Sequence, residues 1–335
     1  MISITKKIKG VRRKLLGMKK IPDLGQAFLH DYYKWLKYSL SINATNTTGK
    51  QKAILLMNLH AIEKGLSFKK AKNGFGKEKV LKLITQTENH LRQHGTDSLG
   101  LAALGVLNQY IQHPQSGKND YIVKQFQTIA DKYQVHSDSL IGGIKPINKE
   151  SVSSDLSYER LYQFAAVRHS VRNFSDADVT EEQILQAVKF AQTAPSVCNR
   201  QTARVHVFEK EAFEPIVNAQ LGDQGWVKNA NKLFIITTDM NFFGGMFERN
   251  QAYIEGGLFS MQFVMGLHAQ KIASCCKMYI RSQANDKAVY KATGIPENEV
   301  LIMLILAGHY EDETVKVPYS FRFPTEDIVN FHLPI

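Results

Sequence analysis

The spacing of hydrophobic and polar positions changes near residue 150. Before this point, apolar residues recur three and four positions apart, which predicts helices over residues 24–42, 55–65, 77–94, 98–112 and 120–133. Gly65 is expected to end the second of these helices. No stretch before residue 150 alternates apolar and polar residues as a strand does. Residues 1–150 are therefore expected to form an all-helical domain.

Beyond residue 150, helical and strand-like stretches alternate. Runs rich in β-branched or aromatic residues predict strands at 204–209, 232–238, 272–280 and 299–307. Helices are expected at 158–167, 211–220, 249–270 and 282–293, and also from a capping box at Thr180–Gln183 to Pro195. This succession indicates an α+β domain over residues 151–335, preceded by a polar linker at 145–157.

The helix expected over residues 249–270 is apolar around much of its surface. Its apolar side chains include Ile254, Leu258, Met261, Phe263, Val264 and Leu267, and two adjacent glycines permit close backbone approach. A helix that is apolar all round must also be covered all round. We therefore expect this helix to form a dimer interface.

The composition is that of a folded protein large enough for two domains, with 335 residues of which 44% are hydrophobic. No run of eighteen apolar residues occurs, and basic residues interrupt the first eighteen positions, so neither a membrane span nor a signal peptide is expected. We expect a cytoplasmic protein.

Neither the cysteines nor the histidines suggest a metal site. Three cysteines, with Cys275 and Cys276 adjacent, fit neither a disulfide framework nor a zinc site, so buried thiols are expected, with redox chemistry as the alternative. His60 and Glu63 share a helical face and could serve a metal or an acid–base pair. A structural hydrogen bond or ion pair is favoured, because no further ligands accompany them.

The net charge of +11 is concentrated in one half. Residues 1–150 carry 25 Lys and Arg against 10 Asp and Glu, whereas residues 151–335 carry 17 against 21. Within residues 1–20, apolar positions form one helical stripe and eight basic residues cover the remainder, as in helices that lie on the anionic inner face of a membrane. A basic tail, packed or unfolded, is an equal alternative. Nucleic acid is the least favoured partner, because no recognised binding module accompanies the charge.

The heptad at residues 168–174, Arg-His-Ser-Val-Arg-Asn-Phe, concentrates hydrogen-bond donors for an anion. Two guanidiniums, an imidazole and a hydroxyl lie within five residues, and guanidinium forks match phosphate oxygens. A solvated basic surface is the alternative for such a run taken alone. The heptad is therefore a candidate site for a phosphorylated cofactor.

Two further segments strengthen this interpretation. Residues 194–201 read Ala-Pro-Ser-Val-Cys-Asn-Arg-Gln, and Ala-Gly-His-Tyr at 307–310 is followed by Pro-Tyr-Ser-Phe-Arg-Phe-Pro at 318–324. In this order and spacing, the three segments resemble the nitroreductase family of FMN-dependent oxidoreductases, over about residues 157–332. The resemblance implies a mixed central sheet flanked by helices, and an intertwined homodimer with flavin at the subunit interface.

The resemblance also implies roles for individual residues. Arg168, His169 and Ser170 would grip the FMN phosphate and ribityl chain. Arg172 would lie beside the pyrimidine side of the ring system, where positive charge stabilises reduced flavin. The partner chain would supply Pro195, Ser196, Val197, Asn199 and Gln201.

Two segments depart from the family pattern. Arg322 matches an arginine that reaches the phosphate, but it follows Gly-His-Tyr instead of Gly-Tyr, and Ser320 stands where a basic residue is common. Where the family has a glycine-rich turn facing flavin N5, this chain has residues 271–278, and we place the N5-facing backbone between Cys276 and Met278.

The expected function is hydride transfer from NAD(P)H through FMN to an electron-poor small molecule, such as a quinone or nitro compound. No side chain stands out as a catalytic acid or base, since the flavin performs the hydride chemistry. One alternative is a catalytically silent flavin-binding or membrane-associated scaffold. Another is a specialised enzyme of this fold that dehalogenates, dehydrogenates or cleaves its flavin.

Overall fold

The computed structural model describes residues 22–42, 47–70, 72–117, 119–148, 156–219 and 227–332. The amphipathic helix predicted over residues 1–20 lies outside these ranges, as do residues 149–155 of the predicted linker. No helix within the described ranges is both long enough and apolar enough to cross a membrane.

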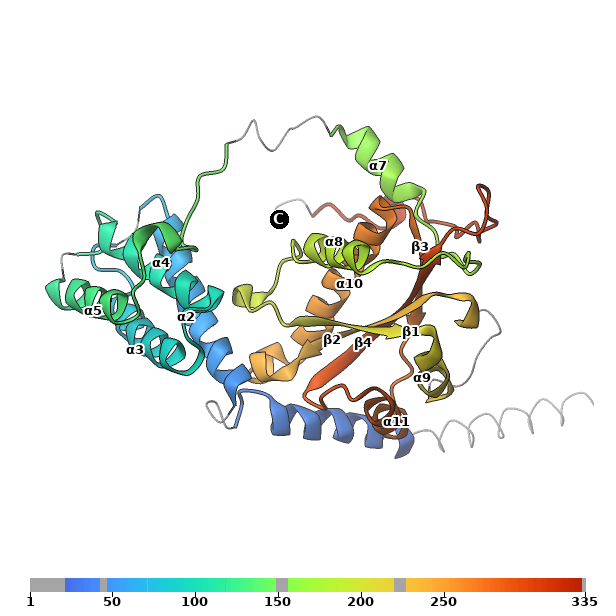
Figure 1. Cartoon of the computed structure of the whole chain (residues 1–335), viewed down its shortest axis with the longest axis horizontal. Coiled ribbons are helices and arrows are strands. Elements are labelled where there is room, and N and C mark those ends of the chain that lie inside the picture. Colours follow the sequence, from blue (N-terminus) through green and yellow to red (C-terminus); the bar gives the residue numbers. More distant parts are fainter. Residues whose placement is uncertain are drawn as a thin grey trace, which may run out of the picture.

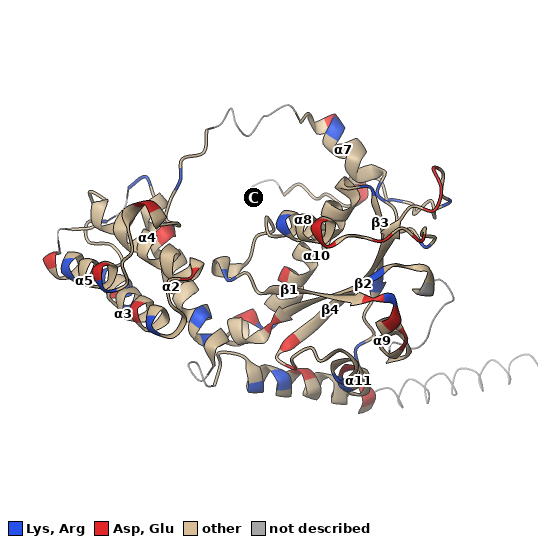
Figure 2. Ribbon diagram, in the orientation of Figure 1, with Lys and Arg blue, Asp and Glu red and all other residues tan. Residues whose placement is uncertain are grey.

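Four helices form a bundle in the N-terminal half: α2 (Thr48–Ser67), α3 (Lys77–His94), α4 (Ser98–Gln112) and α5 (Asp120–Lys132) (Figure 1). Their apolar stripes meet in one core that includes Leu59, Leu83, Leu104, Leu107 and Ile129. The described residues before 150 contain no strand, as predicted. Both signs of charge lie on α3 and α5 (Figure 2).

The prediction that Gly65 ends its helix is wrong, because α2 continues to Ser67. A Cβ atom on Gly65 would lie 2.5 Å from Cε2 of Phe75. Glycine therefore allows the Phe75 ring to pack directly against the helix backbone. The helix also begins earlier than expected, where the Thr47 hydroxyl accepts a hydrogen bond from the Lys50 amide.

The C-terminal half contains an antiparallel sheet of four strands in the order β1 (Ala203–Glu209), β2 (Lys232–Asp239), β4 (Glu299–His309) and β3 (Ile272–Met278). All four predicted strands are confirmed. The sheet also carries one isolated parallel bridge, between Ser170 and Ser274. The central strand β2 is buried along nearly its whole length, which explains its continuous apolar run.

Helices cover both faces of the sheet (Figure 1). Leu233 and Ile235 pack with α9 (Phe213–Ala219) and α11 (Gln283–Thr293), whereas Phe234 and Ile236 pack with α8 (Glu181–Ala191) and α10 (Gln251–Ala269). This alternation follows the two-residue period of a strand. The capping box predicted at the start of α8 is present. The α+β class is therefore confirmed.

Residues 22–38 form a helix that packs beside α11, far from it in sequence (Figure 1). The carboxylate of Asp286, which is 1% exposed, contacts His30 Nε2 at 3.1 Å and Lys34 Nζ at 3.9 Å, and accepts a hydrogen bond from Tyr279 at 2.8 Å. Lys34 also donates to the Tyr290 hydroxyl at 2.5 Å. Burial lowers the pKa of Lys34 to about 8. Helix 22–38 is thus tied to the C-terminal half through buried polar groups.

Candidate functional site

The heptad runs from the end of α7 (Tyr158–Ala166) along the edge of the sheet. The Val171 amide donates to the Ser274 carbonyl of β3 at 3.0 Å, and the Ser175 amide donates to the His309 carbonyl of β4 at 3.0 Å. Phe174 also forms an isolated bridge with Tyr310. The heptad is therefore fixed at one end to β3 and at the other to the end of β4.

The apolar members of the heptad anchor it, which leaves its polar members for the site. Val171 and Phe174 are buried in the core under α9 and α11, Arg168, His169 and Ser170 are half-buried, and Arg172 is exposed. A Cβ atom on Gly308 would lie 2.8 Å from Cβ of Phe174. The glycine in the Ala-Gly-His-Tyr segment thus lets the heptad lie directly on β4.

Arg168 lies near other basic residues, and Arg172 and Lys277 act on the same Cys275 thiol as Arg168 does. Within the described residues, its guanidinium has no hydrogen bond or ion pair, although it influences the pKa values of His268, Cys275 and Tyr310. Burial lowers the pKa of His268, whose Nε2 donates to the Phe164 carbonyl at 3.0 Å, and it raises the pKa values of Cys275 and Tyr310. A half-buried cation without a counterion suits a bound anion.

The other predicted residues of this region lie at the end of β3. Cys275 is buried, as expected, but the expectation of buried thiols is wrong for Cys276, which is exposed, and for Cys198, which is half-buried. β3 is an edge strand, and Cys276 lies near its end. Met278 is also exposed. The bridge between Ser170 and Ser274 and the effect of Arg168 on the Cys276 pKa show that the heptad and residues 274–276 lie together.

The loop at residues 194–201 has an unusual backbone. Cys198, Asn199 and Gln201 have φ angles of 49°, 52° and 51°, in the left-handed region that non-glycine residues rarely adopt. Glu255 of α10 holds the loop, because its carboxylate accepts hydrogen bonds from the Val197 amide at 2.7 Å and the Thr202 hydroxyl at 2.8 Å. Burial raises the pKa of Glu255.

Arg200 is the main support of this loop, and sequence reasoning missed it. Its side chain is fully buried, and its guanidinium donates to both carboxylate oxygens of Glu248, at 2.7 and 3.0 Å. It also donates to the carbonyls of Phe242 at 2.5 Å and Val197 at 3.0 Å, and approaches the Met57 sulfur of α2 at 3.7 Å. No local pattern indicates this burial, since Glu248 lies 48 residues away.

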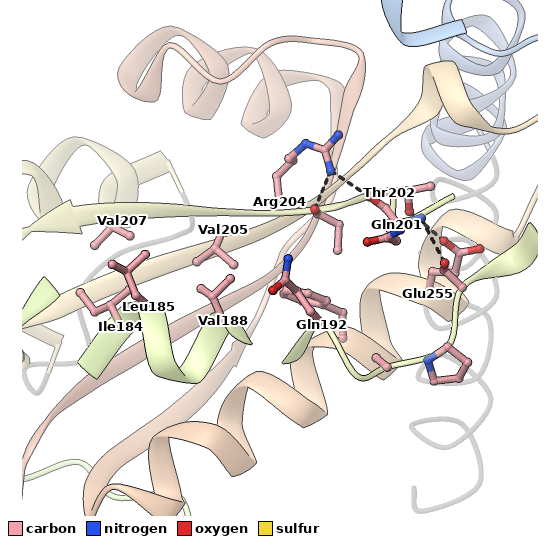
Figure 3. A pocket seen from close by; sticks show the side chains of 15 residues that line it. Ile184, Leu185, Val188, Gln192, Gln201, Thr202, Arg204, Val205, Val207 and Glu255 are labelled. Carbon is pink, nitrogen blue, oxygen red and sulfur yellow. Dashed lines mark hydrogen bonds between the residues drawn. The ribbon is translucent and has the colours of Figure 1, made fainter. Parts of the chain in front are cut away.

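A cavity of about 500 Å³ opens beside the same loop (Figure 3). Figure 3 shows apolar side chains of α8 and β1, including Val188 and Val205, facing one another along one part of it. Gln192, Gln201 and Glu255 gather at the other end. The predicted residues Pro195 and Ser196 also contribute to the lining.

The heptad and the loop lie apart within one chain. His268 lies near the heptad and Glu255 holds the loop, and their separation of 13 residues along α10 corresponds to about 20 Å. Arg322 donates to the carbonyls of Ser320 at 2.6 Å and Phe321 at 3.2 Å. Within the loop, the Gln201 amide donates to the Ser196 hydroxyl at 3.0 Å.

The structure does not support metal binding at His60. Its Nδ1 lies 3.0 Å from the Glu63 carboxylate, which also accepts a hydrogen bond from the Gly143 amide at 3.1 Å. The favoured structural role of this pair is therefore confirmed. No group of three or more metal-binding side chains occurs among the residues that the structure describes.

Solved structures with similar architecture carry nitroreductase names. They include a nitroreductase family protein from Clostridium difficile 630 (20% identity, 51% of this chain and 98% of that chain, TM-score 0.43). An FMN-dependent nitroreductase from Clostridium difficile R20291 gives 21% identity, the same two coverages and the same TM-score. A nitroreductase with bound FMN from Desulfitobacterium hafniense DCB-2 gives 20% identity, 53% and 100% coverage, and a TM-score of 0.40.

No curated protein matches the sequence. The model of the nitroreductase family matches residues 165–221, a segment that contains the heptad, α8, the loop and β1. The resemblance predicted from the sequence is thus confirmed over this segment.

Proposed function

We propose that this protein is an FMN-dependent oxidoreductase that transfers hydride from NAD(P)H to an electron-poor small molecule. The observation that carries the proposal is the half-buried Arg168, which has no counterion in the described structure and lies in the segment that matches the nitroreductase family. A phosphate would supply the missing negative charge.

The residues at the heptad fit a flavin phosphate and ring. Arg168 and Ser170 would hold the phosphate and ribityl chain, and the exposed Arg172 would place positive charge beside the pyrimidine ring. When bound, FMN supplies the hydride chemistry. Burial favours the neutral forms of His268 and Cys275, which leaves Arg168, Arg172 and Lys277 as local charges, so the surroundings favour an anionic ligand.

We further propose that a second copy of the chain completes the site. Large apolar side chains are exposed on α10 and along the C-terminal tail, including Ile254, Leu258, Met261, Phe321, Phe323 and Phe331. Exposed apolar groups of this extent favour an interface between copies. In such a dimer, the loop at 194–201 and Arg322 of one chain can approach the heptad of the other.

FMN titration of Arg168→Ala tests the proposal. Loss of a charge-assisted contact of about 1.5–3 kcal/mol should weaken binding roughly 10- to 150-fold. Arg160→Ala is the matched control, because Arg160 is exposed on α7, eight positions before Arg168. Equal FMN affinity in the two variants would exclude the heptad as the phosphate site. Oxidation of NADH or NADPH with a panel of acceptors separates an enzyme from a silent flavin-binding scaffold.

A further inference from the structure

A second cavity lies between helix 22–38 and the beginning of α10. It measures about 520 Å³, and its walls include the side chains Phe28, Tyr32, Trp35, Met240, Met246 and Tyr253. Cavities of this size bind small organic molecules, and aromatic rings favour planar ligands that can stack against them. Helix 22–38 thus supplies much of a ligand-sized aromatic pocket.

The polar groups of this cavity favour a neutral ligand. Asp31 and Arg249 contribute one charge of each sign, so a strongly charged molecule gains little from their sum. Arg249 Nη1 donates to the Met246 carbonyl at 2.9 Å, and the remaining N–H groups of Arg249 and the Asn250 amide can donate to oxygens of a ligand. A planar, neutral molecule with carbonyl or nitro oxygens meets these conditions.

The cavity also lies close to the backbone expected to face the flavin. Arg281 follows the end of β3 by three residues, or about 10 Å of extended chain. Its guanidinium lies 5.1 Å from the ring centre of Tyr253, which lines the cavity. On the other side, Met246 lines the cavity, and Glu248 of the same short helix holds Arg200 of the loop. The cavity is therefore linked through Tyr253 and Met246 to both candidate elements, the end of β3 and the loop.

We propose that this cavity binds the electron acceptor, and that the acceptor is a neutral aromatic molecule of the quinone class. The inference rests on the proposed oxidoreductase function. NAD(P)H would lose a hydride, the quinone would gain the two electrons and the proton of that hydride together with a second proton from solvent, and the products would be NAD(P)⁺ and a hydroquinone. Tyr32 and Trp35 of helix 22–38 would then determine which acceptors fit.

Trp35 offers a direct measurement of binding. The sequence contains two tryptophans, so Trp226→Phe leaves Trp35 as the only one. In this background, the purified full-length protein is titrated with 1,4-naphthoquinone without nicotinamide, and quenching of Trp35 fluorescence gives the dissociation constant. Tyr32→Ala should raise this constant about threefold to tenfold, through loss of one ring contact.

Tyr33→Ala is the matched control. Tyr32 and Tyr33 are adjacent and both 60% exposed, but only Tyr32 lines the cavity. In steady-state assays, Tyr32→Ala should raise KM for naphthoquinone and leave KM for the nicotinamide unchanged. Equal constants in the two variants, or no saturable quenching because a second copy covers the cavity, would overturn the proposal. Quenching that depends on Tyr32 in a protein that does not bind FMN would support the quinone site and overturn the flavin function.

Discussion

Replacement of Arg200 by methionine should destabilise the protein strongly. The side chain is fully buried and its guanidinium bonds both oxygens of Glu248, so the substitution leaves a carboxylate without its counterion. Breaking a buried ion pair by removing one partner costs about 3–5 kcal/mol. Methionine approximates the length of the arginine stem, so lost packing adds little to this cost.

Two structural details set the expected magnitude. The Glu248 side chain is 24% exposed and keeps a hydrogen bond from the Gly244 amide at 2.8 Å, so water and this amide can partly replace the arginine. This reduces the ion-pair cost to about 3 kcal/mol. The carbonyls of Phe242 and Val197 also lose a donor, at about 1 kcal/mol each. We therefore expect a loss of roughly 3–5 kcal/mol in the free energy of unfolding.

Chemical denaturation at pH 7 measures this loss, and Arg204→Met is the control. Arg204 is exposed and donates to nearby carbonyls of Gln201 and Ala203, so its replacement should cost about 1 kcal/mol or less. Adding Glu248→Gln to Arg200→Met should restore part of the stability, because it removes the uncompensated charge. A loss below about 1 kcal/mol in Arg200→Met would refute the reasoning.

Two further predictions concern Lys34 and Gly308. Burial lowers the pKa of Lys34 from 10.5 to about 8. Between pH 8 and 10.5 the unfolded chain therefore binds more protons than the folded one. The free energy of unfolding of the wild type should rise by up to about 3 kcal/mol from this group as pH increases through this range. Lys34→Met should lack that gain, and pH-dependent denaturation of both proteins checks this. Gly308→Ala should lose about 1–3 kcal/mol by crowding Asn231 and Phe174, whereas Gly25→Ala, with open space around it, should lose none in the same thermal-unfolding assay.

The elements with strong local patterns could be predicted from the sequence. All four strands and the capping box at Thr180 were recognisable, because alternation and capping depend on neighbours a few residues away. Gly65 shows the limit of local reasoning. The same residue type that ends many helices here accommodates the ring of Phe75, and only the tertiary packing distinguishes the two roles.

The candidate site was predictable only in part for the same reason. The heptad could be recognised because its chemistry lies within five residues, and Val171 and Phe174 anchor it as an apolar pair. Arg200 appeared to be one more polar loop residue, since its partner Glu248 comes from a distant segment. The aromatic cavity forms between helix 22–38 and α10, which are even farther apart in the sequence than Arg200 and Glu248.

The domain division at residue 150 remains a prediction, and the buried carboxylate of Asp286 bears on how it should be understood. A carboxylate that is 1% exposed requires compensating partners, and two of those found here, His30 and Lys34, come from the N-terminal half. Arg200 reaches Met57 of α2 in a second contact between the halves. The change in sequence pattern near residue 150 therefore marks a change in secondary structure, while the packing joins helix 22–38 to the C-terminal half. The same helix supplies the walls of the proposed acceptor cavity, so the basic N-terminal half would contribute directly to the selection of the acceptor.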